Sequence, residues 1–235
     1  GVVPIDDRIA RARAEASRSA QARKAFQDQY ANYDIQRLRA EANDAANLRQ
    51  GEDGSERVSA LISAMESRGL ENEIVDRILK NDGTIHNDTG VMATLAGSNN
   101  KVLKAFGKKG NTKFDDFMNG TGTNSMQGYI KSKGKEFLDG LDDKAIKQIG
   151  AYGNGGAMST DLVVEAIAKS NNADSIRELN TILASRGDIK ISGNQLSNFD
   201  ESAIKNLFNN NKARTAMLIA SDDIANDPKL VNNMN

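Results

Sequence analysis

The sequence lacks cysteine and tryptophan, and it contains only one histidine and two prolines among its 235 residues. The absence of cysteine excludes disulfide bonds, thiolate metal sites and cysteine nucleophiles. The single histidine, His86, excludes a zinc site built on a pair of histidines. No stretch approaches the run of about 18 consecutive apolar residues that a membrane-spanning helix requires.

Aromatic residues are also scarce, at 5% of the chain, although 38% of the residues are hydrophobic. A core must therefore be built from aliphatic side chains and methionine, which suits helix pairs better than sheets, because strands favour β-branched and aromatic residues. The composition predicts an all-α fold. The 31 basic and 32 acidic residues give a net charge of −1, so no overall field draws the protein onto nucleic acid.

Residues 6–49 are predicted to form one long helix. Alanine, arginine, glutamate and glutamine dominate this stretch, and neither glycine nor proline interrupts it. Pro4 precedes it, and Gly51 and Gly54 bracket a polar break after it. At 1.5 Å per residue the helix would be roughly 65 Å long, which exceeds a small domain. We therefore expect residues 1–50 to be a separate basic, amphipathic element that projects or finds a partner.

The apolar stripe of this helix begins with Ile5, Ile9, Ala12 and Ala16, and it continues with interruptions. A weak heptad of this kind is compatible with two arrangements. In the first, only the second half of the helix packs on the rest of the protein. In the second, the helix forms a self-associating coiled coil and the protein is a homo-oligomer.

The rest of the chain, residues 51–235, is expected to be an orthogonal-type bundle of short helices separated by glycine and asparagine. Residues 55–68 carry Val58, Leu61, Ile62 and Met65 at helical spacing, and Gly69 follows as a helix stop. Residues 107–134 are rich in glycine and lysine and have few apolar anchors. We expect this segment to be flexible.

Basic residues gather in the first half of the long helix. They outnumber the acids there and are suited to anionic lipid headgroups or phosphates, each at about 1 kcal/mol near a surface. A solvated helix face is the alternative explanation. The candidate residues for an anionic surface are Arg8, Arg11, Arg13, Arg18, Arg23 and Lys24.

Few other groups suggest chemistry. His86 lies between Asp82 and Asp88, but the spacing does not fit an EF-hand, and a turn between helices explains it. The paired acids, such as Asp115 and Asp116, stand near predicted helix starts, where acids stabilise the dipole. The glycine-rich residues 150–160 lack the lysine of a nucleotide-binding loop. We expect no catalytic, cofactor-binding or metal-binding residues and no enzymatic activity.

Lysines recur through residues 101–135, with aromatic rings between them. Such a combination can bind single-stranded nucleic acid by phosphate contact and base stacking. Solvated loops are the alternative. The aromatic residues concerned are Phe106, Phe114 and Tyr129.

The order of these features resembles the cytosolic C-terminal tail of a TrbL-like inner-membrane component of bacterial type IV secretion and conjugation machinery. The resemblance rests on two features. A short apolar segment, residues 1–5, precedes the arginines Arg8, Arg11, Arg13 and Arg18, and two similar predicted helices begin with aspartate, at 142–147 and 200–205. The resemblance implies a non-enzymatic assembly role, and a cytoplasmic location tethered at a membrane.

The sequence therefore predicts an interaction or scaffold module with protein partners. One alternative is a module that binds anionic membranes or nucleic acid, and another is a phage or virion structural protein. The sequence does not identify the partner, the oligomeric state or the source.

Overall fold

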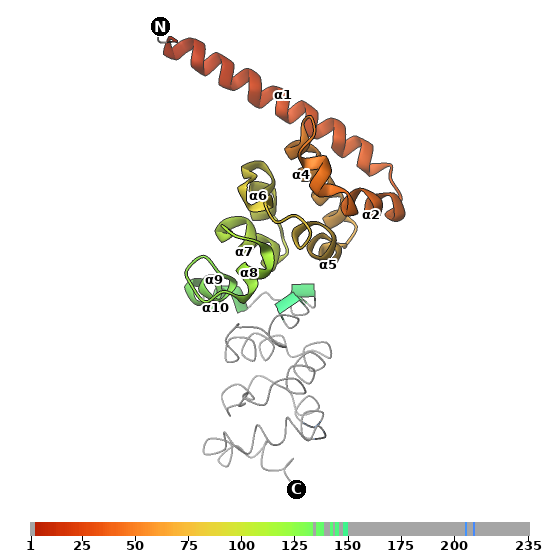
Figure 1. The fold of residues 1–235 in the computed structure, drawn as a ribbon, viewed down its shortest axis with the longest axis vertical. Coiled ribbons are helices and arrows are strands. Elements are labelled where there is room, and N and C mark those ends of the chain that lie inside the picture. The colour runs from red at the N-terminus through yellow and green to blue at the C-terminus, as the bar shows by residue number, and fades with distance from the viewer. Residues whose placement is uncertain are drawn as a thin grey trace. The chain divides into compact units, whose positions relative to one another are not determined.

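The computed structural model describes residues 3–133, 135–138, 142, 144–145, 148–149, 205 and 209. These residues form helices and their connections, and none of them is in a β-strand. The prediction of an all-α fold is therefore confirmed. A long first helix, α1 (Ile5–Ala31), is followed by shorter ones (Figure 1).

The chain divides into two compact units. The first comprises Gly1–Asn99 and Phe106–Phe114, and the second comprises Asn100–Ala105 and Asp115–Asn235. Residues 1–50 therefore share a unit with residues 51–99. The break at Gly51 is a turn between helices of that unit.

The single helix predicted over residues 6–49 is wrong in detail, because the structure has three helices there: α1, α2 (Ile35–Asn43) and α3 (Ala45–Arg49). The Asp34 side chain accepts a hydrogen bond from the Arg37 amide at 2.8 Å and so caps α2. Asn32 ends α1, and Asp44 separates α2 from α3. Asparagine and aspartate side chains compete with the helix for backbone hydrogen bonds, so they can end a helix without glycine or proline.

The core of the first unit is organised around α4 (Gly54–Ser67), which contacts α1, α2, α3 and α6 (Thr89–Ala96). Val58, Leu61, Ile62 and Met65 are buried along one side of α4. Their spacing is the one that predicted this helix. After it, α5 (Glu71–Glu73) runs into a π-helix, η1 (Ile74–Leu79), and a short 3₁₀ turn, η2 (Ile85–Asn87).

Short helices also occupy most of the described part of residues 101–138. They are α7 (Lys101–Lys109), α8 (Phe114–Asn119), α9 (Met126–Lys133) and α10 (Lys135–Leu138). The segment expected to be flexible, 107–134, thus contains helical residues with buried anchors, including Phe114, Phe117, Met118, Met126 and Ile130. Ser125 is buried and its hydroxyl accepts a hydrogen bond from the Gly128 amide at 3.0 Å, which caps the start of α9.

The end of α4 confirms the helix stop predicted at Gly69. Gly69 has a φ of 76°, in the left-handed region where residues with a side chain are strained. The Leu70 amide donates to the Met65 carbonyl at 2.9 Å, and the Gly69 amide donates to the Glu66 carbonyl at 3.0 Å. These two hydrogen bonds satisfy carbonyls at the end of α4 and turn the chain into α5.

Replacing Gly69 with alanine should destabilise the protein by about 1 kcal/mol, because a Cβ atom is strained at positive φ. Urea denaturation followed by circular dichroism measures the change. Gly51→Ala is the matched control, since no positive φ occurs there and its nearest heavy atom to an added Cβ is at 3.4 Å. An equal loss of stability in both variants would contradict this account.

Candidate interaction surface

One face of α1 follows a regular pattern along the whole helix. Residues spaced alternately by four and three positions lie on one side of a helix. In α1 this pattern runs without a break from Ile5 to Tyr30. Its members are Ile5, Ile9, Ala12, Ala16, Ser19, Arg23, Phe26 and Tyr30.

The second half of this face is covered by other helices of the same unit. The Ser19 hydroxyl donates to the Glu56 carboxylate of α4 at 2.7 Å. The Arg23 guanidinium donates to the Thr94 hydroxyl of α6 at 2.7 Å. These contacts anchor α1 from Ser19 onward.

Two aromatic rings also anchor the C-terminal half of α1. The ring of Tyr30 is fully buried, and burial raises the pKa of Tyr30 to about 12. The guanidinium of Arg57, on α4, lies 4.3 Å from the centre of the Phe26 ring, where a cation is attracted by the ring face. The C-terminal half of α1 is thus held by burial and by polar contacts.

The first half of the same face is uncovered. Every residue from Pro4 to Arg18 is exposed, and the side chains of Ile5 and Ile9 are 66% and 45% exposed. Figure 1 shows α1 running on past the helices that cover its other end. Single exposed aliphatic residues are common, but these continue a face that other helices partly cover farther along α1. We call Ile5, Ile9, Ala12 and Ala16 the N-terminal stripe.

The six predicted anion-binding residues fall into two groups. Arg18 approaches Asp53 at 3.6 Å, Lys24 pairs with Asp28 at 3.3 Å, and Arg23 is bound to Thr94. The side chains of Arg18 and Lys24 are still 73% and 74% exposed, and the remaining three residues, Arg8, Arg11 and Arg13, are exposed as well. Between residues 4 and 16 they are balanced by Asp6, Asp7 and Glu15, so three positive charges meet three negative charges. The exposed surface is mixed in charge rather than cationic.

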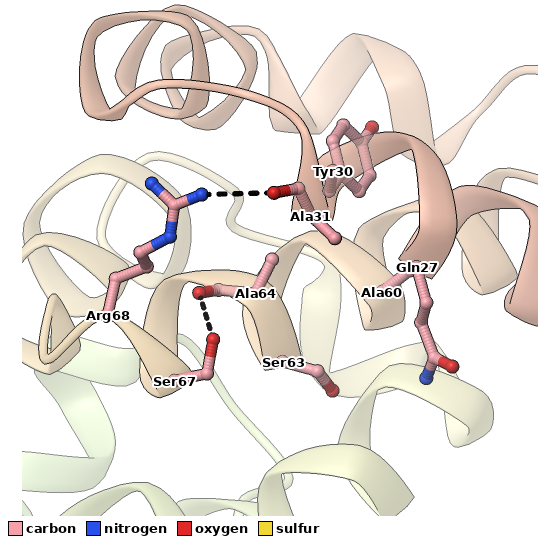
Figure 2. A pocket seen from close by; sticks show the side chains of 8 residues that line it. All are labelled: Gln27, Tyr30, Ala31, Ala60, Ser63, Ala64, Ser67 and Arg68. Atoms are coloured by element: carbon pink, nitrogen blue, oxygen red, sulfur yellow. Dashed lines mark hydrogen bonds between the residues drawn. The ribbon is translucent and has the colours of Figure 1, made fainter.

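A groove of about 320 Å³ lies between the end of α1 and α4 (Figure 2). Arg68 lines the groove, and its guanidinium donates to the carbonyls of Ala31 at 3.3 Å and Tyr33 at 2.7 Å. The groove was not predicted from the sequence, although small residues at helical spacing in α4 were a signal for it. Its lining consists of Gln27, Tyr30, Ala31, Ala60, Ser63, Ala64, Ser67 and Arg68.

A nearly buried ion cluster holds the connector before α6. The Arg49 guanidinium donates to Asp82 at 2.7 and 3.1 Å and lies 3.6 Å from Asp88. The three side chains are 12%, 5% and 11% exposed. Burial alone would raise the pKa of Asp82, but hydrogen bonds from Arg49 and Thr84 hold that pKa below its ordinary value.

Asp88 also organises the start of α6. Its carboxylate accepts hydrogen bonds from the Val91 amide at 3.0 Å and from the Ser55 hydroxyl at 2.7 Å, so it caps α6 and ties that helix to α4. From the sequence, Asp82 and Asp88 were expected to belong to a turn between helices, without a metal ion. In the structure both carboxylates lie beside the guanidinium of Arg49, a contact that was not predicted from the sequence.

The other sequence candidates have structural roles where the structure describes them. The rings of Phe106, Phe114 and Tyr129 are 0%, 1% and 5% exposed, so they offer no face on which a base could stack. Asp115 and Asp116 stand in the first turn of α8. The Asp142 carboxylate accepts from the Ala145 amide at 2.9 Å, as expected for a helix start.

Several sequence features lie outside the described residues. They include the glycine-rich residues 150–160 and nearly all of the second helix start at 200–205. Within the described ranges, no group of three or more histidine, cysteine, aspartate or glutamate residues is arranged to hold a metal ion. Within the same ranges, no helix combines the length and the apolar character needed to cross a bilayer.

Replacing Arg49 with methionine should destabilise the protein by about 3–5 kcal/mol, because two nearly buried carboxylates would lose their cation. Arg39→Met is the control. Arg39 pairs with Glu73 at 2.6 Å nearer the surface, and Arg77 also binds Glu73, at 3.0 Å. That variant should lose no more than about 1 kcal/mol. Denaturation midpoints measure both, and equal losses would contradict the importance of the Arg49 cluster.

Stability should also fall in acid, beginning near the ordinary carboxyl pKa of 3.8 for Asp82. Because the folded-state pKa is lowered, the unfolded chain binds a proton first as the pH falls. The stabilisation is therefore complete above pH 3.8 and is lost as the pH falls through the folded-state value. Urea denaturation between pH 7 and pH 2.5 follows this loss. Arg49→Met should flatten the acid limb, and an unchanged limb would refute the assignment.

Comparison with known proteins identifies no relative: no family model, no curated protein and no solved structure matches this chain. The resemblance to a TrbL-like secretion component therefore stays a prediction.

Proposed function

We propose that this protein is a non-enzymatic interaction module whose contact surface is the N-terminal stripe of α1. The observation that supports this is the continuity of one helix face. The face is covered from Ser19 to Tyr30, yet it is uncovered at Ile5 and Ile9, which are 66% and 45% exposed. The covered half consists of Ser19, Arg23, Phe26 and Tyr30, whereas the aliphatic residues lie in the uncovered half. Burying Ile5 and Ile9 against a partner would remove this apolar area from water, which is favourable.

The chemistry of the stripe favours another helix as its occupant. Ala12 and Ala16 are small, so a second helix backbone can approach closely at these positions, while Ile5 and Ile9 supply apolar area. The flanking charges are of both signs, so they can pair with a protein surface whose charges are arranged in the complementary order. The ion clusters around Arg49 and Glu73 are satisfied internally, which favours structural roles for them.

Binding to an anionic membrane is the second candidate function. The observation in its favour is the exposure of Arg8, Arg11 and Arg13 beside Ile5 and Ile9, a combination found in helices that lie on membranes. Against it, the three neighbouring acids cancel the positive charge. Vesicles containing phosphatidylserine separate the two candidates, because a membrane-binding helix would bind them in low salt and release them in high salt.

Site-specific photocrosslinking tests the proposed function. A photoreactive phenylalanine analogue placed at Ala12 in the cells that make the protein should crosslink to protein. The same analogue at Ala14 is the matched control. Ala14 is also exposed but lies about 200° away around the helix, so it should give little crosslinking.

The comparison between the two positions decides the outcome. Crosslinks to protein at Ala12 that exceed those at Ala14 support a protein-binding face on the stripe. Equal labelling at both positions, or no protein crosslink at Ala12, contradicts the proposal.

A further inference from the structure

We infer that the partner of the N-terminal stripe is a second copy of this chain, bound antiparallel to the first. This inference rests on the proposed function, since it names the occupant of the same surface. It is carried by two features of residues 5–16: the order of large and small residues along the stripe, and the order of charges on its two flanks.

The core positions pair large residues with small ones. In heptad terms Ile5 and Ala12 occupy d positions, and Ile9 and Ala16 occupy a positions. In an antiparallel pair an a position faces a d position of the other helix. Ile9 then faces Ala12 of the second copy, and Ile5 faces Ala16. Each layer contains one large and one small side chain, so the layers have similar volumes and the helices stay evenly spaced.

The flanking charges fit the same register. Arg8 and Glu15 occupy g positions, and Asp6 and Arg13 occupy e positions. In an antiparallel pair g faces g and e faces e. Arg8 of each copy therefore lies across from Glu15 of the other, and Asp6 lies across from Arg13. All four cross-helix pairs have opposite signs.

A parallel pair would not fit the charges. In a parallel pair a g position faces the next e position of the other helix. Arg8 of each copy would then meet Arg13 of the other copy, which produces two repulsive contacts. Like charges in such positions are destabilising. The charge pattern therefore selects the antiparallel arrangement.

The exposed length of α1 leaves room for this pairing. With Ile9 opposite Ala12, Pro4 of one copy is level with Ser17 of the other, and both residues are exposed. Helix α1 of the second copy begins at Ile5, which is level with Ala16, so the two helices pair before Ser19, where α4 begins to cover the helix face. The contact extends over less than the three or four heptads of a sustained coiled coil, so the association is weak and depends on concentration.

Cysteine crosslinking tests the orientation directly, because the chain has no cysteine of its own. The variants Ile5→Cys and Ala16→Cys are oxidised separately and as a mixture. In the antiparallel pair residue 5 lies beside residue 16 of the other copy. Two copies of residue 5 are about 16 Å apart along the helix axis, too far for a disulfide. Dimer should form in the mixture and not in either variant alone, and Ala14→Cys mixed with Ile5→Cys is the control.

Charge reversal supplies an independent measurement. Arg8→Glu should weaken dimerisation in sedimentation equilibrium by about threefold to tenfold, since two ion pairs become repulsive contacts. Adding Glu15→Arg to the same chain should restore it.

Three results would overturn the inference: disulfides in each single variant alone, failure of the charge swap to restore dimerisation, or a chain that stays monomeric at about 1 mM. Its failure is distinguishable from failure of the proposed function. If the chain is monomeric but still crosslinks to another protein from Ala12, only the inference of a second copy is contradicted. If the chain is monomeric and gives no such crosslink, both the inference and the proposed function are contradicted.

Discussion

The packing of the second half of α1 against α4 is the constraint on which the account of this protein depends. Tyr30 is fully buried at one end of the contact, and Ser19 is hydrogen-bonded to Glu56 at the other. These contacts fix the orientation of the helix as well as its position. The face that meets α4 is therefore the face on which Ile5 and Ile9 lie further along. Because the helix is anchored at one end, its exposed end is already ordered before a partner binds. Binding therefore costs little conformational entropy.

The Arg49 cluster holds other segments of the first unit together. It joins the end of α3, the connector after the π-helix and the cap of α6 through one guanidinium and two carboxylates. A nearly buried ion group of this kind adds little net stability compared with apolar packing, yet its disruption is costly. It explains how a connector rich in asparagine, aspartate and glycine is held in one arrangement.

Local patterns predicted much of the fold, whereas contacts distant in the sequence were not predicted. The apolar spacing of α4 and the stop at Gly69 were visible because both depend on neighbouring residues. The break at Asn32–Asp34 was missed because polar caps, unlike glycine or proline, are also tolerated inside helices. The spacing of the N-terminal stripe was visible in the sequence. The residue at which the face becomes covered, Ser19, was not, because it depends on contacts with the distant residues Glu56 and Thr94. The partner of Asp82 was missed because Arg49 is 33 residues away.

Amide hydrogen exchange along α1 tests the central claim most directly, namely that the protein covers one half of a continuous helix face and leaves the other half for a partner. In dilute solution the amides of residues 9–16 should exchange faster than those of residues 23–30, because only the latter are held against α4 and α6. At high concentration the exchange of residues 9–16 should slow while that of residues 23–30 is unchanged. Equal protection of both halves in dilute solution would contradict the account.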